Sequence, residues 1–144
     1  MTTLLFVYGT LTPGHDAWPV LEPWVVGTPH DDAVPGQLYD TGRGYPAATF
    51  GTPGDRDNVV YGMVVELDPA RAREALAALD RYEGDEYERI PVRTHAGVAA
   101  STYAWIAPLA GCRPVRTGRW PAGRGPVVRE NDAPQAETSG PDGR

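Results

Sequence analysis

The fold class is decided by residues 59–84, VVYGMVVELDPARAREALAALDRYEG, in which a predicted strand runs directly into a predicted helix. The opening VVYGMVVEL is rich in Val and largely apolar, which is typical of an interior strand. Asp68 and Pro69 then predict a helix start, because Asp is a good N-cap and Pro suits the first helical position. Residues 70–82 consist mainly of Ala, Leu and Arg, which favour a helix, and Gly84 is typical of a helix end.

Short apolar segments on both sides of this unit predict further strands. Residues 3–8 are expected to form a buried first strand, with a short helix near 16–21. Residues 24–50 are interpreted as short strands joined by loops, because Gly, Pro and Asp separate the apolar pieces. Residues 87–94 and 100–107 look like an antiparallel pair. One main helix among several short strands predicts an α+β fold, a small closed or strongly curved sheet with a helix packed against it.

Length and hydropathy indicate a single domain without a membrane-spanning segment. The chain has 144 residues, and we expect one domain over 1–125. Residues 126–144 lack apolar spacing and are expected to be a disordered tail. The mean hydropathy is −0.39, and we find neither a long apolar stretch nor a signal-like start. We therefore expect no membrane association and a cytoplasmic location.

Charge and the supply of metal-ligating side chains argue against several classes of function. Thirteen basic against nineteen acidic side chains give a net charge of −6, which disfavours a nucleic-acid partner. The Arg-rich stretch 113–129 is expected to be a solvated segment that docks on nearby acidic surface. The single cysteine, Cys112, excludes an internal disulfide and cysteine-rich zinc sites, and the three histidines are scattered. We therefore expect no metal and no other cofactor, and the oligomeric state is left open.

Glu83 is the most informative single residue. It is spaced i, i+3, i+7 with Leu76 and Leu79, so the three side chains share one apolar face of the predicted helix. Desolvation there would raise the pKa of the carboxyl, and the negative end of the helix dipole also disfavours its charge. One interpretation is a general base of raised basicity in a pocket. The other is a frayed helix end in which Glu83 pairs with Arg81 or Arg89 in solvent.

A second candidate is the loop Tyr8-Gly9-Thr10-Leu11, directly after the first predicted strand. Gly9 would let the chain turn sharply and expose consecutive backbone N–H groups. Such groups can hold a carboxylate or an oxyanion without any charged side chain. The alternative is an ordinary turn at the end of a strand.

Several motifs occur together in the order and spacing of one known family. They are FVYGTL at 6–11, VYGMVVEL at 60–67 and LDRYEG at 79–84 followed by YER at 87–89, with looser agreement at 44–47 (GYPA) and 103–105 (YAW). Over roughly residues 4–122 the chain thus resembles the γ-glutamylcyclotransferase-like superfamily, of the γ-glutamylamine cyclotransferase type.

The resemblance implies a small mixed β-barrel with flanking helices and a cavity lined by the 8–11 loop and Glu83. It implies a cofactor-free reaction that cyclises a γ-glutamyl amide or peptide and releases 5-oxoproline and a free amine. Glu83 would be the general acid/base, and the γ-glutamyl substrate would be bound by Tyr8, Gly9, Thr10, Leu11, Tyr87 and Tyr103. The alternative is a non-catalytic small-ligand-binding or regulatory protein that uses the same cavity. The identity of the leaving amine stays open.

Overall fold

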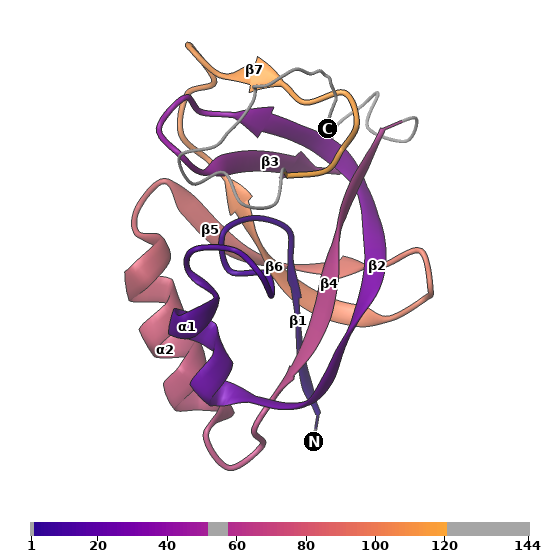
Figure 1. The fold of residues 1–144 in the computed structure, drawn as a ribbon, viewed down its shortest axis with the longest axis vertical. Helices are drawn as coiled ribbons and strands as arrows, with labels where there is room; N and C mark the ends of the chain where they lie inside the picture. The colour runs from indigo at the N-terminus through magenta and orange to yellow at the C-terminus, as the bar shows by residue number, and fades with distance from the viewer. Residues whose placement is uncertain (1, 52–57, 121–144) are drawn as a thin grey trace.

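The computed structural model describes residues 2–51 and 58–120 (Figure 1). The predicted tail 126–144 and the end of the predicted domain at residue 125 lie outside these residues. The strands are β1 (Thr3–Val7), β2 (Val25–Asp40), β3 (Pro46–Phe50), β4 (Val59–Leu67), β5 (Tyr87–Arg93), β6 (Ala99–Trp105) and β7 (Arg113–Pro114). The helices are α1 (Trp18–Leu21), the 3-10 turn η1 (Glu22–Trp24) and α2 (Ala72–Glu83).

The strands form one curled mixed sheet, with both α-helices beside it (Figure 1). Its order is β3-β2-β4-β1-β6-β5, and β7 pairs with β2 off this path. Strands β1 and β6 run parallel, whereas the other pairs are antiparallel. The sheet curls because β2 pairs first with β4 and then, over its last residues, with β3 and β7. The predicted α+β fold is confirmed, in the form of a half-barrel.

The prediction of short strands joined by loops over residues 24–50 is wrong for most of that range. Strand β2 is continuous over 16 residues and passes through Gly27, Pro29 and Pro35. Gly27 has a φ of 72°, and the register with β4 shifts between Val26 and His30, so the breakers lie at a bulge. Pro35 lies where β2 exchanges one partner strand for another. Residues that would stop an isolated strand are tolerated here because the hydrogen-bond ladder is already interrupted by a bulge or is passing from one partner strand to another.

Helix α2 begins three residues later than the sequence predicts, at Ala72 and not at Pro69. Its N-cap position is Arg71, and the first helical bond runs from the Ala75 N–H to the Arg71 carbonyl. Asp68 instead organises the preceding turn, where its carboxylate accepts the Ala70 N–H at 3.0 Å. The predicted end is confirmed, since Gly84 follows the helix with a φ of 78°.

Strand β1 lies in the middle of the fold and supplies side chains to both halves of the core. Leu5 and Val7 pack on the side of the helices with Leu79, whereas Phe6 and Tyr8 pack on the opposite side. The second cluster also contains Val34, Leu38, Ala48, Val60, Val64, Ala100 and Trp120. Because β1 is buried on both faces, the chain leaves it inside the molecule, where the loop 8–11 begins.

The described part of the Arg-rich segment, up to residue 120, docks on the sheet. Arg113 lies opposite Asp40 in the backbone ladder between β7 and β2. The Arg119 guanidinium lies 3.9 Å from the centre of the Tyr61 ring. Trp120 is buried, so the docking is partly apolar as well as electrostatic. Among the described residues, no helix is long and apolar enough to cross a membrane.

Candidate active site

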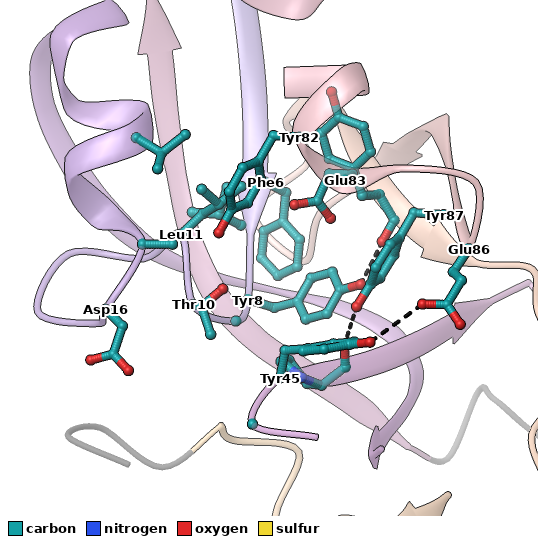
Figure 2. A pocket seen from close by; sticks show the side chains of 17 residues that line it. Phe6, Tyr8, Thr10, Leu11, Asp16, Tyr45, Tyr82, Glu83, Glu86 and Tyr87 are labelled. Atoms are coloured by element: carbon teal, nitrogen blue, oxygen red, sulfur yellow. Dashed lines mark hydrogen bonds between the residues drawn. The ribbon is translucent and has the colours of Figure 1, made fainter. Parts of the chain in front are cut away.

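A cavity of about 550 Å³ lies where β1 ends, between the loop that follows β1, the C-terminal end of α2 and the start of β3 (Figure 2). Every residue that the sequence singled out for the site lines it, namely Glu83, Tyr8, Gly9, Thr10, Leu11, Tyr87 and Tyr103. These side chains come from segments far apart in the sequence, and the curled sheet brings them together.

Glu83 is the last residue of α2 and points into this cavity (Figure 2). Leu79, one turn earlier on the same face, is fully buried, which draws the end of the helix against the core. Burial raises the pKa of the Glu83 carboxyl from 4.5 to about 7. The carboxyl is therefore divided between its acid and base forms near neutral pH, as an acid/base catalyst requires.

The interpretation in which Glu83 pairs with an arginine in solvent is not supported. The helix continues through Glu83, and Arg89 instead bonds both carboxylate oxygens of Asp80, at 3.0 and 3.2 Å. The Tyr103 hydroxyl donates to the same Asp80 carboxylate at 2.6 Å. Within residues 2–51 and 58–120, the Glu83 carboxyl has no ion pair and no hydrogen-bond partner. Asp80 carries the structural ion pair at this end of α2.

Four tyrosines surround the Glu83 carboxyl closely enough for its charge to raise their pKa: Tyr8, Tyr82, Tyr87 and Tyr103. For each of them burial is the larger cause of the raised pKa, so the phenols stay neutral. The Tyr8 hydroxyl donates to the Tyr103 carbonyl, and the Tyr87 hydroxyl donates to the Pro46 carbonyl at 2.6 Å. Their oxygen atoms keep acceptor capacity toward the cavity.

The loop after β1 is held by its carbonyl groups. The Gly9 carbonyl accepts the N–H of Thr12 at 3.1 Å and also the Thr12 hydroxyl, and the Thr10 carbonyl accepts the Ala17 N–H at 2.9 Å. In the described part of the chain, the N–H groups of Gly9, Thr10 and Leu11 have no hydrogen-bond acceptor. The loop therefore presents free backbone donors beside the cavity, as an anion-binding turn does.

Glycine is needed at position 9 for a reason other than the expected sharp turn. Gly9 does not have a positive φ. A Cβ atom there would lie 2.6 Å from Cγ and 2.9 Å from Cδ of Pro46, closer than van der Waals contact allows. Gly9 thus lets the 8–11 loop pack directly against the start of β3.

The rim of the cavity carries charged residues that the sequence did not single out. Glu86 accepts a hydrogen bond from Tyr45 at 3.3 Å and pairs with Arg43 at 3.0 Å. Asp16 lies on the opposite side of the cavity, at the outer edge (Figure 2). Among the described residues, no group of three or more His, Cys, Asp or Glu side chains could hold a metal ion.

A family model for γ-glutamyl cyclotransferase, AIG2-like proteins matches residues 5–122, most of the chain. The chain belongs to this family. The predicted resemblance is thereby confirmed, and the family is one of enzymes of the γ-glutamyl cyclotransferase type. No curated protein sequence matches the chain.

Solved structures agree with the family assignment. The YtfP protein of Escherichia coli is 31% identical, with a TM-score of 0.52 over 82% of this chain and 96% of that one. An AIG2-like protein of Mus musculus is 20% identical, with a TM-score of 0.59 over 74% of this chain and 80% of that one. A uropathogenic E. coli-specific protein has a TM-score of 0.67 at 20% identity, over 83% and 92% of the two chains. At such identities the last two show a shared fold.

In this cyclotransferase-like chain, sequence reasoning missed most of the residues that surround the core of the site. Tyr82 is 49% exposed and lines the cavity. Asp16 and Glu86 lie in turns, where no periodicity marks the direction of a side chain. For Tyr45 the sequence contains one signal, the loose GYPA match at 44–47.

Proposed function

We propose that this protein is a cofactor-free γ-glutamyl cyclotransferase that converts a γ-glutamyl amide or peptide to 5-oxoproline and a free amine, with Glu83 as general acid/base. The observation that carries the proposal is the environment of the Glu83 carboxyl. This carboxyl lies in a cavity with a pKa of about 7, and it has no partner among the described residues. Family membership supports the same reaction type.

The chemistry needs little from the protein because the substrate carries its own nucleophile. The α-ammonium of the glutamyl group first loses one proton to solvent, and the neutral α-amine then attacks the γ-carbonyl carbon, forming a C–N bond and a tetrahedral oxyanion. Glu83 takes the second proton from the α-nitrogen and delivers it to the leaving nitrogen as the original amide bond breaks. The products are 5-oxoproline and the amine, and no water is consumed. Holding amine and carbonyl in contact can supply up to ~7–11 kcal/mol of the barrier.

The rest of the cavity has groups suited to the other parts of this substrate. The free N–H groups of residues 9–11 suit the α-carboxylate or the developing oxyanion. The hydroxyl oxygens of Tyr8 and Tyr87, whose protons are donated to backbone carbonyls, can accept hydrogen bonds from the α-ammonium. The Tyr103 hydroxyl donates to Asp80, so Tyr103 contributes to the substrate site through its ring and through its carbonyl, which positions the Tyr8 hydroxyl.

The test is mass-spectrometric detection of 5-oxoproline after incubation with a panel of γ-glutamyl amines, γ-glutamyl dipeptides and glutathione. Glu83→Gln keeps the shape of the side chain but cannot take up the proton, so we expect its turnover to fall at least about 100-fold. Glu74→Gln is the matched control. It makes the same change on an exposed residue in the first turn of α2, and we expect turnover like that of wild type.

The outcomes separate an enzyme from a binding protein. An enzyme forms 5-oxoproline in the wild type and loses turnover, but not affinity for substrate, in Glu83→Gln. A folded wild type that binds panel members and forms no 5-oxoproline would be a small-ligand-binding or regulatory protein instead.

A further inference from the structure

The turn that follows the 8–11 loop holds a histidine that the proposed reaction does not use. Residues 12–15, Thr-Pro-Gly-His, form a tight turn in which the His15 N–H donates to the Thr12 carbonyl at 3.0 Å. Pro at the second position and Gly at the third, with a φ of 87° at Gly14, are typical of a type II turn. The turn brings His15 back onto Thr12, and Nδ1 of its ring lies 2.7 Å from the Thr12 hydroxyl oxygen.

The proton positions in this contact follow from the partners. The Thr12 hydroxyl also contacts the Gly9 carbonyl, which can only accept, so the hydroxyl proton points to Gly9. Nδ1 of His15 must then donate to the Thr12 oxygen. Nε2 of the same ring is buried and has no partner in the described part of the chain, which fits a neutral ring with its proton on Nδ1. Thr12 is only 5% exposed, so water competes little for its hydroxyl.

These two residues fix the rotation of the peptide between Gly9 and Thr10. Both lone pairs of the Gly9 carbonyl are used, one by the Thr12 hydroxyl and one by the Thr12 N–H at 3.1 Å. A trans peptide directs its N–H opposite to its carbonyl, so the Thr10 N–H points away from Thr12. Gly9 and Thr10 line the cavity, and no described residue accepts the Thr10 N–H. The contact between Gly9 and Pro46 sets where the loop lies, whereas Thr12 and His15 set the direction of this donor.

The direction of this donor matters because the cavity wall offers an anion no cationic side chain. Within the described residues, its lining includes no Arg, Lys or His. The α-carboxylate of a γ-glutamyl group therefore depends on backbone N–H groups. Because a hydrogen bond is directional, rotation of the 9–10 peptide would turn the Thr10 N–H away from that carboxylate.

We propose that Thr12 and His15 are positioning residues for substrate binding. His15 orients the Thr12 hydroxyl, and Thr12 holds the Gly9–Thr10 peptide so that the Thr10 N–H donates to the α-carboxylate. The proposal rests on the cyclotransferase function proposed above. The carboxylate takes no part in the bond changes, so it is bound alike in the ground state and in the transition state. Loss of the positioning residues therefore raises KM and leaves kcat nearly unchanged.

The first test compares KM and kcat of Thr12 variants. Thr12→Val keeps the shape of the side chain and removes the hydroxyl, and we expect KM to rise roughly three- to tenfold. Thr12→Ser keeps the hydroxyl and should keep the wild-type KM. Thr94→Val is the matched control, because Thr94 is also 5% exposed but follows β5 at the opposite end from Tyr87, outside the cavity lining. It should change stability and not KM.

The His15 variants test whether both residues act through one hydroxyl. His15→Leu removes the donor to Thr12, and we expect KM to rise roughly two- to threefold. His15→Asn keeps an N–H close to the position of Nδ1 and should restore KM. The double variant Thr12→Val with His15→Leu should bind substrate no worse than Thr12→Val alone. Effects that multiply would contradict the proposal.

A second test measures recognition of the carboxylate without turnover. 5-Oxoproline keeps the α-carboxylate of the substrate, and 2-pyrrolidinone is the same ring without it. In NMR titrations the wild type should prefer 5-oxoproline. Thr12→Val should reduce that preference roughly three- to tenfold and leave the dissociation constant of 2-pyrrolidinone unchanged.

The two tests separate this proposal from the proposed reaction. Turnover to 5-oxoproline with the same KM in the wild type and in Thr12→Val would overturn the positioning role and leave the cyclotransferase intact. A preference for 5-oxoproline that Thr12→Val weakens, in a wild type without turnover, would support the positioning role in a binding protein. A wild type that shows no preference between the two ligands would overturn it.

Discussion

Glu83 illustrates how one residue can be costly to the fold and useful to the site. Its carboxyl lies at the C-terminal end of a helix, where the helix dipole disfavours a negative charge, and it is largely buried in a cavity. The neighbouring carboxylate, Asp80, has the opposite environment, because Arg89 and Tyr103 hold its pKa below the usual value. Two acids one turn apart therefore serve different purposes, one structural and one proposed to be chemical.

The Glu83 carboxyl should make stability depend on pH. Its pKa is higher in the folded protein (about 7) than the ordinary 4.5, so between these values the folded state binds more protons than the unfolded state. Raising the pH through this window therefore destabilises the wild type. Glu83→Gln does not ionise, and its unfolding free energy relative to wild type should rise by about 1–3 kcal/mol between pH 5 and pH 8.

Denaturant unfolding of both proteins at the two pH values measures this difference. Glu74→Gln should show no comparable change, since that residue is exposed. A loss of stability in Glu83→Gln at pH 8 would instead mean that the carboxylate is held by an ion pair.

At the scale of elements, the site depends on the contact between the 8–11 loop and the start of β3. A Cβ atom on Gly9 would overlap with Cγ and Cδ of Pro46, and Pro46 also accepts the Tyr87 hydroxyl through its carbonyl. Displacing either segment would widen the cavity on the side opposite α2. The geometry of the loop is thus set by a tertiary contact rather than by its own backbone preference.

Gly9→Ala should therefore destabilise the protein by about 1–3 kcal/mol, the usual cost of overpacking. Pro46→Ala removes the two overlapping atoms, so the double variant should recover most of that loss. A double-mutant cycle of unfolding free energies measures the coupling. Additive effects of the two substitutions would show that the contact does not set the loop.

At the scale of the whole molecule, residues 113–120 close the far side of the sheet. The Gly118 carbonyl accepts the Tyr61 N–H at 2.8 Å, and the buried Trp120 ring joins the cluster on the side away from the helices. Gly118 has a φ of 72°, and a Cβ atom there would lie 1.9 Å from the Val59 carbonyl oxygen. The segment can approach β4 this closely only with glycine at that position.

Gly118→Ala should cost at least about 2–3 kcal/mol of unfolding free energy, since it adds a clash with backbone to the strain of a left-handed residue. Gly111→Ala is the matched control. Gly111 has a φ of 84°, but a Cβ atom there would meet nothing within 4 Å, so we expect only the strain, about 1 kcal/mol. Equal losses in the two variants would contradict a close docking of the 113–120 segment.

Prediction from sequence succeeded where local pattern decides the structure. The β4–α2 unit and its end at Gly84 follow from apolar spacing and a glycine stop, both properties of neighbouring residues. It failed for β2, where Gly27, Pro29 and Pro35 are strand breakers in isolation. Their tolerance depends on a bulge and on a change of partner strand, which only the assembled sheet supplies.

The sequence by itself determined the fold class, the family and the residues proposed for the reaction, because helical periodicity and short motifs depend only on residues that are close together in the chain. Only the tertiary structure decided the environment of those residues. Arg89 lies close to Glu83 in the sequence, yet its partner is Asp80, and Glu83 is left facing a cavity. Asp16 and Glu86 reach the rim of that cavity through turns. The burial of a side chain, the charges near it and its hydrogen-bond or ion-pair partners depend on distances between residues far apart in the chain. Those distances are set only when the sheet curls.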